Sequence, residues 1–353
     1  MTLRFTVDPN HLHTPEAIEA LEQAAQILRA GGLVALPTET VYGLGANALD
    51  PEAVARIFAA KQRPHWDPVI VHVDTLEMVR PLVREIPEPA RRLAQAFWPG
   101  PLTLLLPRSE RVPDAVTAGR PLVGVRMPAH PVAWELIHRA GVPIAAPSAN
   151  LFSHISPTTA AHVLADLDGR IDAIVDAGPA RHGVESTVLD PTQTPPVIYR
   201  PGAVTREEIE RVVQGVEFYV APGDRSGAET SPEPPESLPS PGVGIRHYAP
   251  RARLVLVEGE FSCLAALLAE AARPHAGQRL GVMLPAEVEL PGELAAAEIF
   301  SWGVWKQPET LARALYAGLR RLDGLGCQVI LCPLPPNRGI GRAIEDRLRK
   351  AAR

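Results

Sequence analysis

Cysteine is scarce in this chain of 353 residues, and its three copies lie late, at Cys263, Cys327 and Cys332. None of them shows the CxxC spacing of zinc or redox motifs, so we expect reduced thiols in a cytoplasmic protein. No apolar run reaches the roughly 18 residues that span a bilayer, and the N-terminal segment lacks the apolar core of a signal peptide. These absences exclude a disulfide scaffold and predict no membrane partner.

Aromatic residues are also few, at 5% of the chain, whereas proline occurs 38 times, which indicates rigid loops around aliphatic cores. Acidic residues outnumber basic residues, 40 to 35, and the formal net charge is −5. The molecule as a whole therefore does not attract nucleic acid. A local basic cleft would still do so. A hydrophobic content of 46% with 21% charged residues is typical of a soluble globular protein, and the length suggests two domains.

Short apolar runs alternate with helical periodicity along most of the chain, which predicts an α/β fold. Residues 221–250 differ, because they are rich in proline, serine and glycine and lack periodicity. Such a segment is typical of an extended linker. We therefore predict a first, catalytic domain at 1–220, a linker at 221–250 and a smaller α/β domain with a parallel sheet at 251–353.

A helix is predicted to begin after Asp50, which suits an N-cap and is followed by proline, and to end at Lys61 and Arg63. Spacing alone favours solvated cations at this helix end, where they interact with the helix dipole. Because Arg63 lies beyond the helix, we expect it to contribute little to the core. A serine–proline pair predicts another helix start at Ser156.

The familiar catalytic motifs are missing. A GxGxxA pattern at residues 43–48 matches the dinucleotide fingerprint, but six residues separate it from the preceding apolar run. Its glycines therefore do not form the immediate strand-to-helix turn that the fingerprint requires. There is no P-loop, no zinc-binding spacing and no nucleophile elbow. A covalent protein nucleophile is not indicated.

Cations and hydroxyls at predicted strand ends are what remains: Thr40, Lys61, Arg63, Arg126, Ser148, Asn150, Ser186 and Arg200. Open α/β sheets bind ligands at this edge. The planar fork of arginine donates two parallel hydrogen bonds to a carboxylate or phosphate. This set favours an anionic ligand, such as a nucleotide together with an amino acid.

Ordered motifs over roughly residues 15–215 resemble the YrdC-like threonylcarbamoyl-AMP synthase family. They are LPTETVYGLGANA, KQRP, VIVH, FWPGPLTLLL, VGVRMPAHP, PIAAPSAN, GVESTVLD and IYRPG, with the family's KxR at 61–63 and its SxN at 148–150. The proline-rich linker and trailing domain resemble the longer, two-domain form. The resemblance implies a twisted open mixed sheet with a positively charged cavity, followed by a smaller Rossmann-like domain.

The resemblance also implies a reaction. Such an enzyme makes threonylcarbamoyl-AMP and pyrophosphate from L-threonine, bicarbonate and ATP, and we expect Mg²⁺ to be bound to ATP without a dedicated metal site in the protein. The product would pass to a separate tRNA threonylcarbamoyl transferase complex, with a weak contact to tRNA. That complex modifies the adenosine beside the anticodon of tRNAs that read ANN codons.

Residue by residue, the resemblance assigns L-threonine to Thr40, His72, Arg126, Ala146 and Ser186, with Arg126 at the carboxylate. It assigns ATP to Arg63, Asp67, Leu122, Ser148, Asn150, Ser156, Arg200 and Ile245, and catalysis to Lys61 and Arg63. Three positions depart from the family pattern. Asp67 adds a carboxylate that would repel phosphate unless Mg²⁺ or Lys61 compensates, Leu122 offers only backbone, and Ile245 replaces an aromatic that often covers the nucleotide.

Two other functions use the same cations. A module that binds double-stranded RNA or tRNA would place phosphates in the basic cavity, but the acidic net charge and the many hydroxyls argue against it. A carbamoyltransferase domain of the hydrogenase-maturation type is the other, and the chain lacks its zinc-finger and acylphosphatase-like segments.

Overall fold

The computed structural model describes residues 1–220, residue 240 and residues 247–353. Contacts divide the chain into two compact units, Met1–Phe152 with Pro157–Ala180 and Glu185–Gly244, and Ser153–Ser156 with Arg181–Val184 and Ile245–Arg353. Most of the predicted linker, and the predicted nucleotide residue Ile245, lie outside the described residues.

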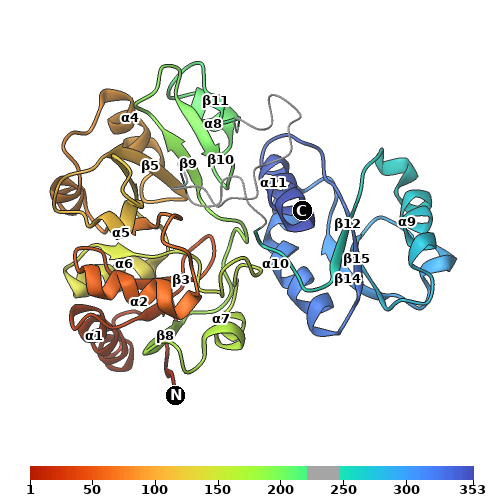
Figure 1. Cartoon of the computed structure of the whole chain (residues 1–353), viewed down its shortest axis with the longest axis horizontal. Helices are drawn as coiled ribbons and strands as arrows, with labels where there is room; N and C mark the ends of the chain where they lie inside the picture. Colours follow the sequence, from red (N-terminus) through yellow and green to blue (C-terminus); the bar gives the residue numbers. More distant parts are fainter. Residues whose placement is uncertain (221–239, 241–246) are drawn as a thin grey trace. The chain divides into compact units, whose positions relative to one another are not determined.

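A mixed sheet forms the centre of the first unit (Figure 1). Its strands are β1 (Leu3–Thr6), β2 (Val34–Leu36), β3 (Gly43–Asn47), β4 (Ile70–His72), β5 (Leu102–Pro107), β6 (Leu122–Arg126), β7 (Ile144–Ala145), β8 (Ala173–Asp176), β9 (Thr187–Asp190), β10 (Val197–Arg200) and β11 (Glu217–Phe218). Their spatial order is β1-β8-β2-β3-β7-β4-β6-β5-β9-β10-β11. Parallel pairs such as β4 with β6 occur beside antiparallel pairs such as β2 with β3, which confirms the predicted mixed sheet.

Helices of the first unit include the one that the sequence predicts after Asp50. They are α1 (Pro15–Arg29), α2 (Pro51–Lys61), α3 (Leu76–Val79), the 3-10 helix η1 (Arg80–Leu82), α4 (Glu88–Phe97), α5 (Asp114–Thr117), α6 (Pro131–Ala140), α7 (Ala160–Leu167) and α8 (Arg206–Glu210). The Asp50 side chain accepts hydrogen bonds from two amides of the first turn of α2. Thr205 closes a capping box with Glu208 at α8.

Helices cover both faces of this sheet, and β2 shows how. Val34 and Leu36 pack into one hydrophobic cluster with α1 and α6, whereas Ala35 belongs to a second cluster that includes Ile57 of α2. All three residues of β2 are buried, which explains the continuous apolar run of this strand. The polar residues that follow β2, such as Thr40, lie beyond the end of this strand.

The structure confirms one local prediction, that the glycines at 43–48 form no strand-to-helix turn, and corrects another. The glycine-rich segment after Tyr42 is strand β3, and a Cβ added at Gly45 would lie 2.8 Å from the side chain of Leu36. Glycine therefore allows close packing there, and no helix follows directly. The helix predicted from Ser156 begins instead at Ala160, because the side chain of Thr159 accepts the hydrogen bond from the amide of His162.

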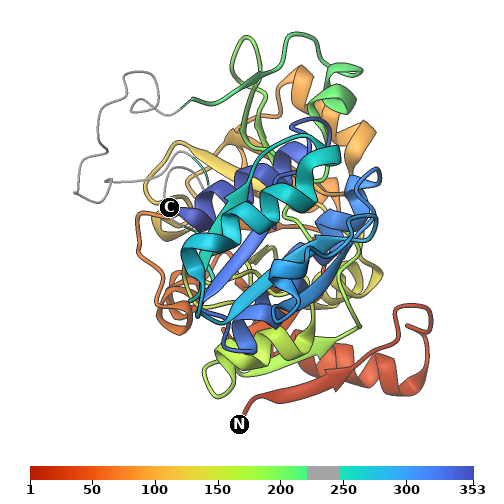
Figure 2. The same cartoon turned by 90° about the vertical axis from the view of Figure 1, so that its right-hand side faces the viewer.

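The second unit contains a smaller, all-parallel sheet in the order β12-β15-β13-β14. Its elements are β12 (Arg253–Val257), η3 (Phe261–Cys263), α9 (Leu264–Ala272), η4 (Arg273–His275), β13 (Leu280–Pro285), η5 (Gly292–Leu294), β14 (Glu298–Gly303), α10 (Pro308–Gly324), β15 (Val329–Pro333) and α11 (Gly341–Ala352). Helix α9 covers one face, and α10 and α11 cover the other (Figures 1 and 2). The predicted second α/β sheet is confirmed. In the described part of the chain, no helix is both long and apolar enough to cross a membrane.

Candidate active site

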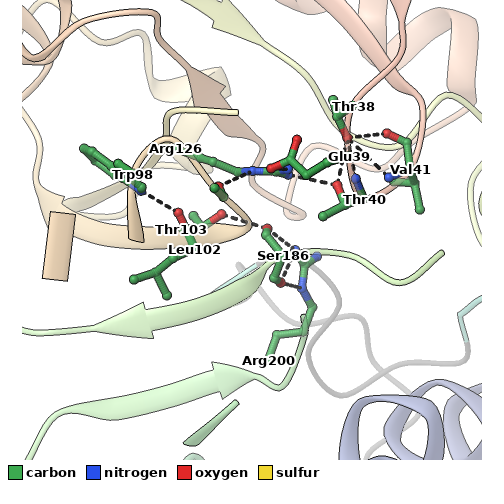
Figure 3. Close-up of polar contacts among 11 residues, drawn as sticks. Thr38, Glu39, Thr40, Val41, Trp98, Leu102, Thr103, Arg126, Ser186 and Arg200 are labelled. Atoms are coloured by element: carbon green, nitrogen blue, oxygen red, sulfur yellow. Dashed lines mark hydrogen bonds and ion pairs between the residues drawn. The ribbon is translucent and has the colours of Figure 1, made fainter. Parts of the chain in front are cut away.

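Arg126 ends strand β6 and is the centre of a buried polar cluster in the first unit (Figure 3). Its Nη1 donates a hydrogen bond to Oγ1 of Thr40 at 3.0 Å, and its Nε donates to the carbonyl of Gly100 at 3.2 Å. Its Nη2 lies 2.6 Å from Oε1 of Glu39, in an ion pair whose two side chains are almost fully buried. The guanidinium is therefore held in one orientation before any ligand arrives.

Thr40 is fixed by a short turn. The hydroxyl of Thr38 donates to the carbonyl of Val41 at 2.6 Å and lies 2.8 Å from Oγ1 of Thr40. The amides of Thr40 and Val41 donate back to the same hydroxyl. The polar run after β2 thus places one hydroxyl and one carboxylate beside Arg126.

His72 stands opposite Arg126 in the register of strands β4 and β6. Burial, with the positive charge of Arg126 second, lowers the pKa of this imidazole to about 3. It is therefore neutral, and its Nδ1 has no hydrogen-bond partner among the described residues. Ala146 lies nearby, since its amide donates to the carbonyl of Ile70 at 2.9 Å.

Ser186 and Arg200 form the next part of the site, just before β9 and at the end of β10. Arg200 donates from Nε and Nη2 to the carbonyl of Ser186 at 3.1 and 3.0 Å, and from Nη2 to its hydroxyl at 3.1 Å. That hydroxyl also lies 2.8 Å from Oγ1 of Thr103 (Figure 3). Both cation and hydroxyl are buried, so a ligand here would meet a rigid surface.

Lys61 is buried at the end of α2, with 1% of its surface exposed. Its Nζ donates to the carbonyls of Ser148 and Asn150, both at 2.5 Å. Burial first, and then the charge of Arg63, lower the pKa of this ammonium well below its usual value. Lys61 thus ties the KxR segment to the SxN segment.

Arg63 pairs with Asp67, whose carboxylate lies 2.8 Å away and is completely buried. Arg63 also donates to the carbonyls of Asp67 and Pro68, at 3.1 and 2.7 Å. Burial raises the pKa of Asp67, and the charges of Arg63, Lys61 and Arg200 oppose that change. Arg63 compensates the carboxylate more directly than Lys61 does.

This geometry overturns the interpretation of Lys61 and Arg63 as solvated cations, because their exposed fractions are 1% and 7%. It also overturns the expectation that Arg63 contributes little to the core. The chain after α2 turns back, with Gln62 in the left-handed region, and carries Arg63 inward. Sequence spacing does not reveal such a reversal.

The remaining predicted site residues are Leu122, Ser156 and Ile245. Leu122 begins β6, at the opposite end from Arg126, and packs beside an apolar group that includes Ile70 and Val188. Ser156 belongs to a short segment assigned to the second unit. Ile245 lies outside the described residues. Their proposed contacts with nucleotide stay predictions.

The candidate site also contains residues that were not in the predicted set: Glu39, Gly100 and Thr103. Glu39 stands between Thr38 and Thr40 in a polar run, so its position after β2 was a usable signal. Thr103 lies inside the apolar run of β5, and Gly100 contributes only a carbonyl, so neither gave a signal.

Comparisons with known proteins identify the family of this chain. A family model of Sua5, YciO and YrdC proteins, described as telomere recombination, matches residues 26–202. A model described as the C-terminal domain of threonylcarbamoyl-AMP synthase matches residues 204–353. The threonylcarbamoyl-AMP synthase of Pyrococcus abyssi is 45% identical over 331 residues, 93% of either chain. The chain belongs to the threonylcarbamoyl-AMP synthase family.

Other members of this family extend the agreement. The threonylcarbamoyl-AMP synthase of Bacillus subtilis is 44% identical over 94% of this chain and 92% of its own. A solved structure of P. abyssi Sua5 complexed with L-threonine is 41% identical, with a TM-score of 0.86, and covers 100% of this chain and 97% of the other. The predicted family and enzyme class, a nucleotidyltransferase, are confirmed, and the comparisons favour them over an RNA-binding module.

Proposed function

We propose that this chain joins L-threonine, bicarbonate and ATP to form threonylcarbamoyl-AMP and pyrophosphate. The observation that supports this most directly is the pair of buried cation clusters in the first unit, around Arg126 and around Lys61 and Arg63. One cluster suits the carboxylate of an amino acid and the other suits phosphate. Family membership supplies the reaction that joins such ligands.

The chemistry needs no protein nucleophile. The threonine amine reacts with bicarbonate and loses water, which gives a carbamate. A carbamate oxygen then attacks the α-phosphorus of ATP, and pyrophosphate leaves in line. Fixed cations lower the barrier by positioning the reactants and stabilising the charge that develops. The rigid hydrogen bonding of Arg63 and Arg200 fits that role.

On the amino-acid side, we assign the threonine carboxylate to Arg126 and its polar groups to Thr40, neutral His72 and Ser186, with the backbone of Ala146 beside them. On the nucleotide side, we keep the predicted set of Arg63, Asp67, Leu122, Ser148, Asn150, Ser156, Arg200 and Ile245. Lys61 acts by holding the carbonyls of the SxN segment in place, and its charge faces the same cluster as Arg63.

Mg²⁺ enters this proposal as part of the ATP substrate. In the described part of the chain, no group of three or more His, Cys, Asp or Glu side chains is arranged to hold a metal ion. Asp67 is turned toward Arg63 in a fully buried ion pair. We therefore propose that the ion is coordinated by the triphosphate and water, as is common for Mg²⁺.

We propose a catalytic domain at 1–220, a linker at 221–250 that covers the active site, and a C-terminal domain at 251–353. The product would pass to a tRNA threonylcarbamoyl transferase complex in the cytoplasm, with a weak contact to tRNA.

ATP–pyrophosphate exchange tests the proposed reaction, with threonine and bicarbonate omitted in turn. We expect exchange only when both are present, and equal exchange without threonine would contradict the proposal. RNA binding that falls steeply with salt, without such exchange, would favour the RNA-binding module instead.

A further inference from the structure

We propose that Glu39 binds the amino group of the substrate and makes the pocket selective for a zwitterionic amino acid, an inference that rests on the proposed function. Glu39 lies one residue before Thr40 and is 5% exposed. Neither the KxR nor the SxN signature includes it. Its role follows from its placement beside Arg126.

The ion pair between Glu39 and Arg126 uses only part of each group. Oε1 of Glu39 is 2.6 Å from Nη2 of Arg126, and Figure 3 shows the second carboxylate oxygen pointing away from the guanidinium. Neither oxygen accepts a hydrogen bond of regular geometry from the described residues. Each terminal nitrogen of Arg126 also carries a second N–H, so a substrate carboxylate can bind there in a bidentate manner.

An α-amino acid matches these unused groups. Its amino nitrogen is two bonds from its carboxylate carbon, so a ligand whose carboxylate is held by Arg126 has its ammonium close to the guanidinium edge. Glu39 occupies that edge. The second oxygen of Glu39 can accept a charge-assisted hydrogen bond from the ammonium while Oε1 stays near Arg126.

Charge balance leads to the same conclusion. The titratable groups that face Glu39 are Arg126, His72 and His130, and burial lowers the pKa of both imidazoles. Arg126 and Glu39 therefore form a neutral pair, and a zwitterion keeps the pocket neutral. A ligand with a carboxylate but no ammonium would leave one uncompensated negative charge in a buried site, which is strongly unfavourable.

Glu39 acts here as a fixed charge. Burial alone raises the pKa of its carboxyl, but the charge of Arg126 opposes burial. Arg126 and two backbone amides also approach the carboxylate without forming regular hydrogen bonds, and together these groups hold the pKa below its usual value. The group stays ionised near neutral pH and is a weak proton acceptor. Its contribution is to recognise and orient the amine that later becomes the carbamate.

Calorimetric titration of the full-length protein can test this. The two ligands are L-threonine and 2,3-dihydroxybutanoate of the same configuration, in which a hydroxyl replaces the amino group. We expect the wild type to bind threonine about 10- to 100-fold more tightly. In Glu39→Gln, threonine should weaken by a similar factor, whereas the hydroxy acid should change by less than about threefold or bind better.

Asp190→Asn is the matched control, because Asp190 is a fully buried carboxylate whose partners are Thr192 and Gln193, at the far end of β9. Its ligand preference should equal that of the wild type. Equal weakening of both ligands in Glu39→Gln would overturn the inference, because Glu39 would then only hold Arg126 in place. An unchanged preference for threonine over the hydroxy acid in Glu39→Gln would overturn it too.

Two further measurements keep the test decisive if Glu39→Gln does not fold. Glu39→Asp keeps the charge and should retain part of the preference for threonine. A wild type that binds both ligands equally overturns the inference without any variant. A wild type that binds no threonine overturns the proposed function as well, so the two failures are distinguishable.

Discussion

The hydroxyl oxygens of Thr103 and Ser186 lie 2.8 Å apart and join strand β5 to the start of β9. These strands are parallel neighbours, and Ser186 also receives hydrogen bonds from Arg200. A residue inside an apolar strand therefore sets the position of a serine that the family resemblance assigns to threonine binding. The active site depends on a hydroxyl that has no polar neighbours in its own strand segment.

Thr103→Val should consequently lower threonine-dependent activity about two- to tenfold with little change in ATP affinity, since one neutral hydrogen bond is lost and the shape is kept. Steady-state kinetics with each substrate varied measures this. Thr117→Val is the control, because Thr117 is equally buried and its hydroxyl accepts a hydrogen bond from Arg108. A similar loss in both variants would show that the effect is general destabilisation.

Arg63→Ala should lower the free energy of unfolding by about 3–5 kcal/mol, because it leaves the carboxylate of Asp67 buried without its ion-pair partner. The double variant Arg63→Ala/Asp67→Ala should recover part of that stability. We expect both the single and the double variant to lack threonylcarbamoyl-AMP synthesis. Urea unfolding measures the effect on stability, and pyrophosphate release measures the effect on activity. An active double variant would remove Arg63 from the catalytic set.

The sequence predicts features that depend on neighbouring residues better than features that depend on contacts between distant segments. Asp50 sets the start of α2 through local hydrogen bonds, so this helix start was predictable from neighbouring residues. Strand β3 was missed, because its glycines serve close packing against Leu36, which lies on another strand. Arg63 was misjudged because its ion pair depends on a chain reversal. Local signals were predictable, and contacts between distant segments were not.

Arg126→Lys should weaken threonine about 10- to 100-fold while ATP affinity changes by less than about threefold. Lysine keeps a positive charge for Glu39 but cannot donate two parallel hydrogen bonds to a carboxylate. Apparent affinities for both substrates, from kinetics or calorimetry, check this expectation. A larger loss for ATP would mean that the two subsites are exchanged.

Acid should destabilise the wild type more than Glu39→Gln. The pKa of Glu39 is lower in the folded protein than its ordinary value of 4.5. The ionised group therefore stabilises the fold fully above about pH 4.5, and this contribution is lost as pH falls through the folded pKa. Urea midpoints between pH 3 and 7 should converge for the two proteins toward low pH. Parallel curves would contradict the lowered pKa.

A protein that ends at Val220 tests the proposed role of the linker. The segment 221–250 is long and stiffened by proline, so it can run across a surface instead of coiling. A cover over the adenylate would exclude water from a labile product. We expect the truncated protein to make less threonylcarbamoyl-AMP and to hydrolyse more ATP without product, as measured by comparing adenylate with total AMP and ADP.

Circular dichroism and urea unfolding of the shortened protein serve as its control, because a misfolded first domain would lose both reactions together. Uncoupled hydrolysis in a folded protein separates loss of a cover from loss of the site. Adding residues 221–250 back, without 251–353, should restore coupling if the linker is sufficient. Full adenylate yield from the protein that ends at Val220, without extra hydrolysis, would show that the linker only connects two domains.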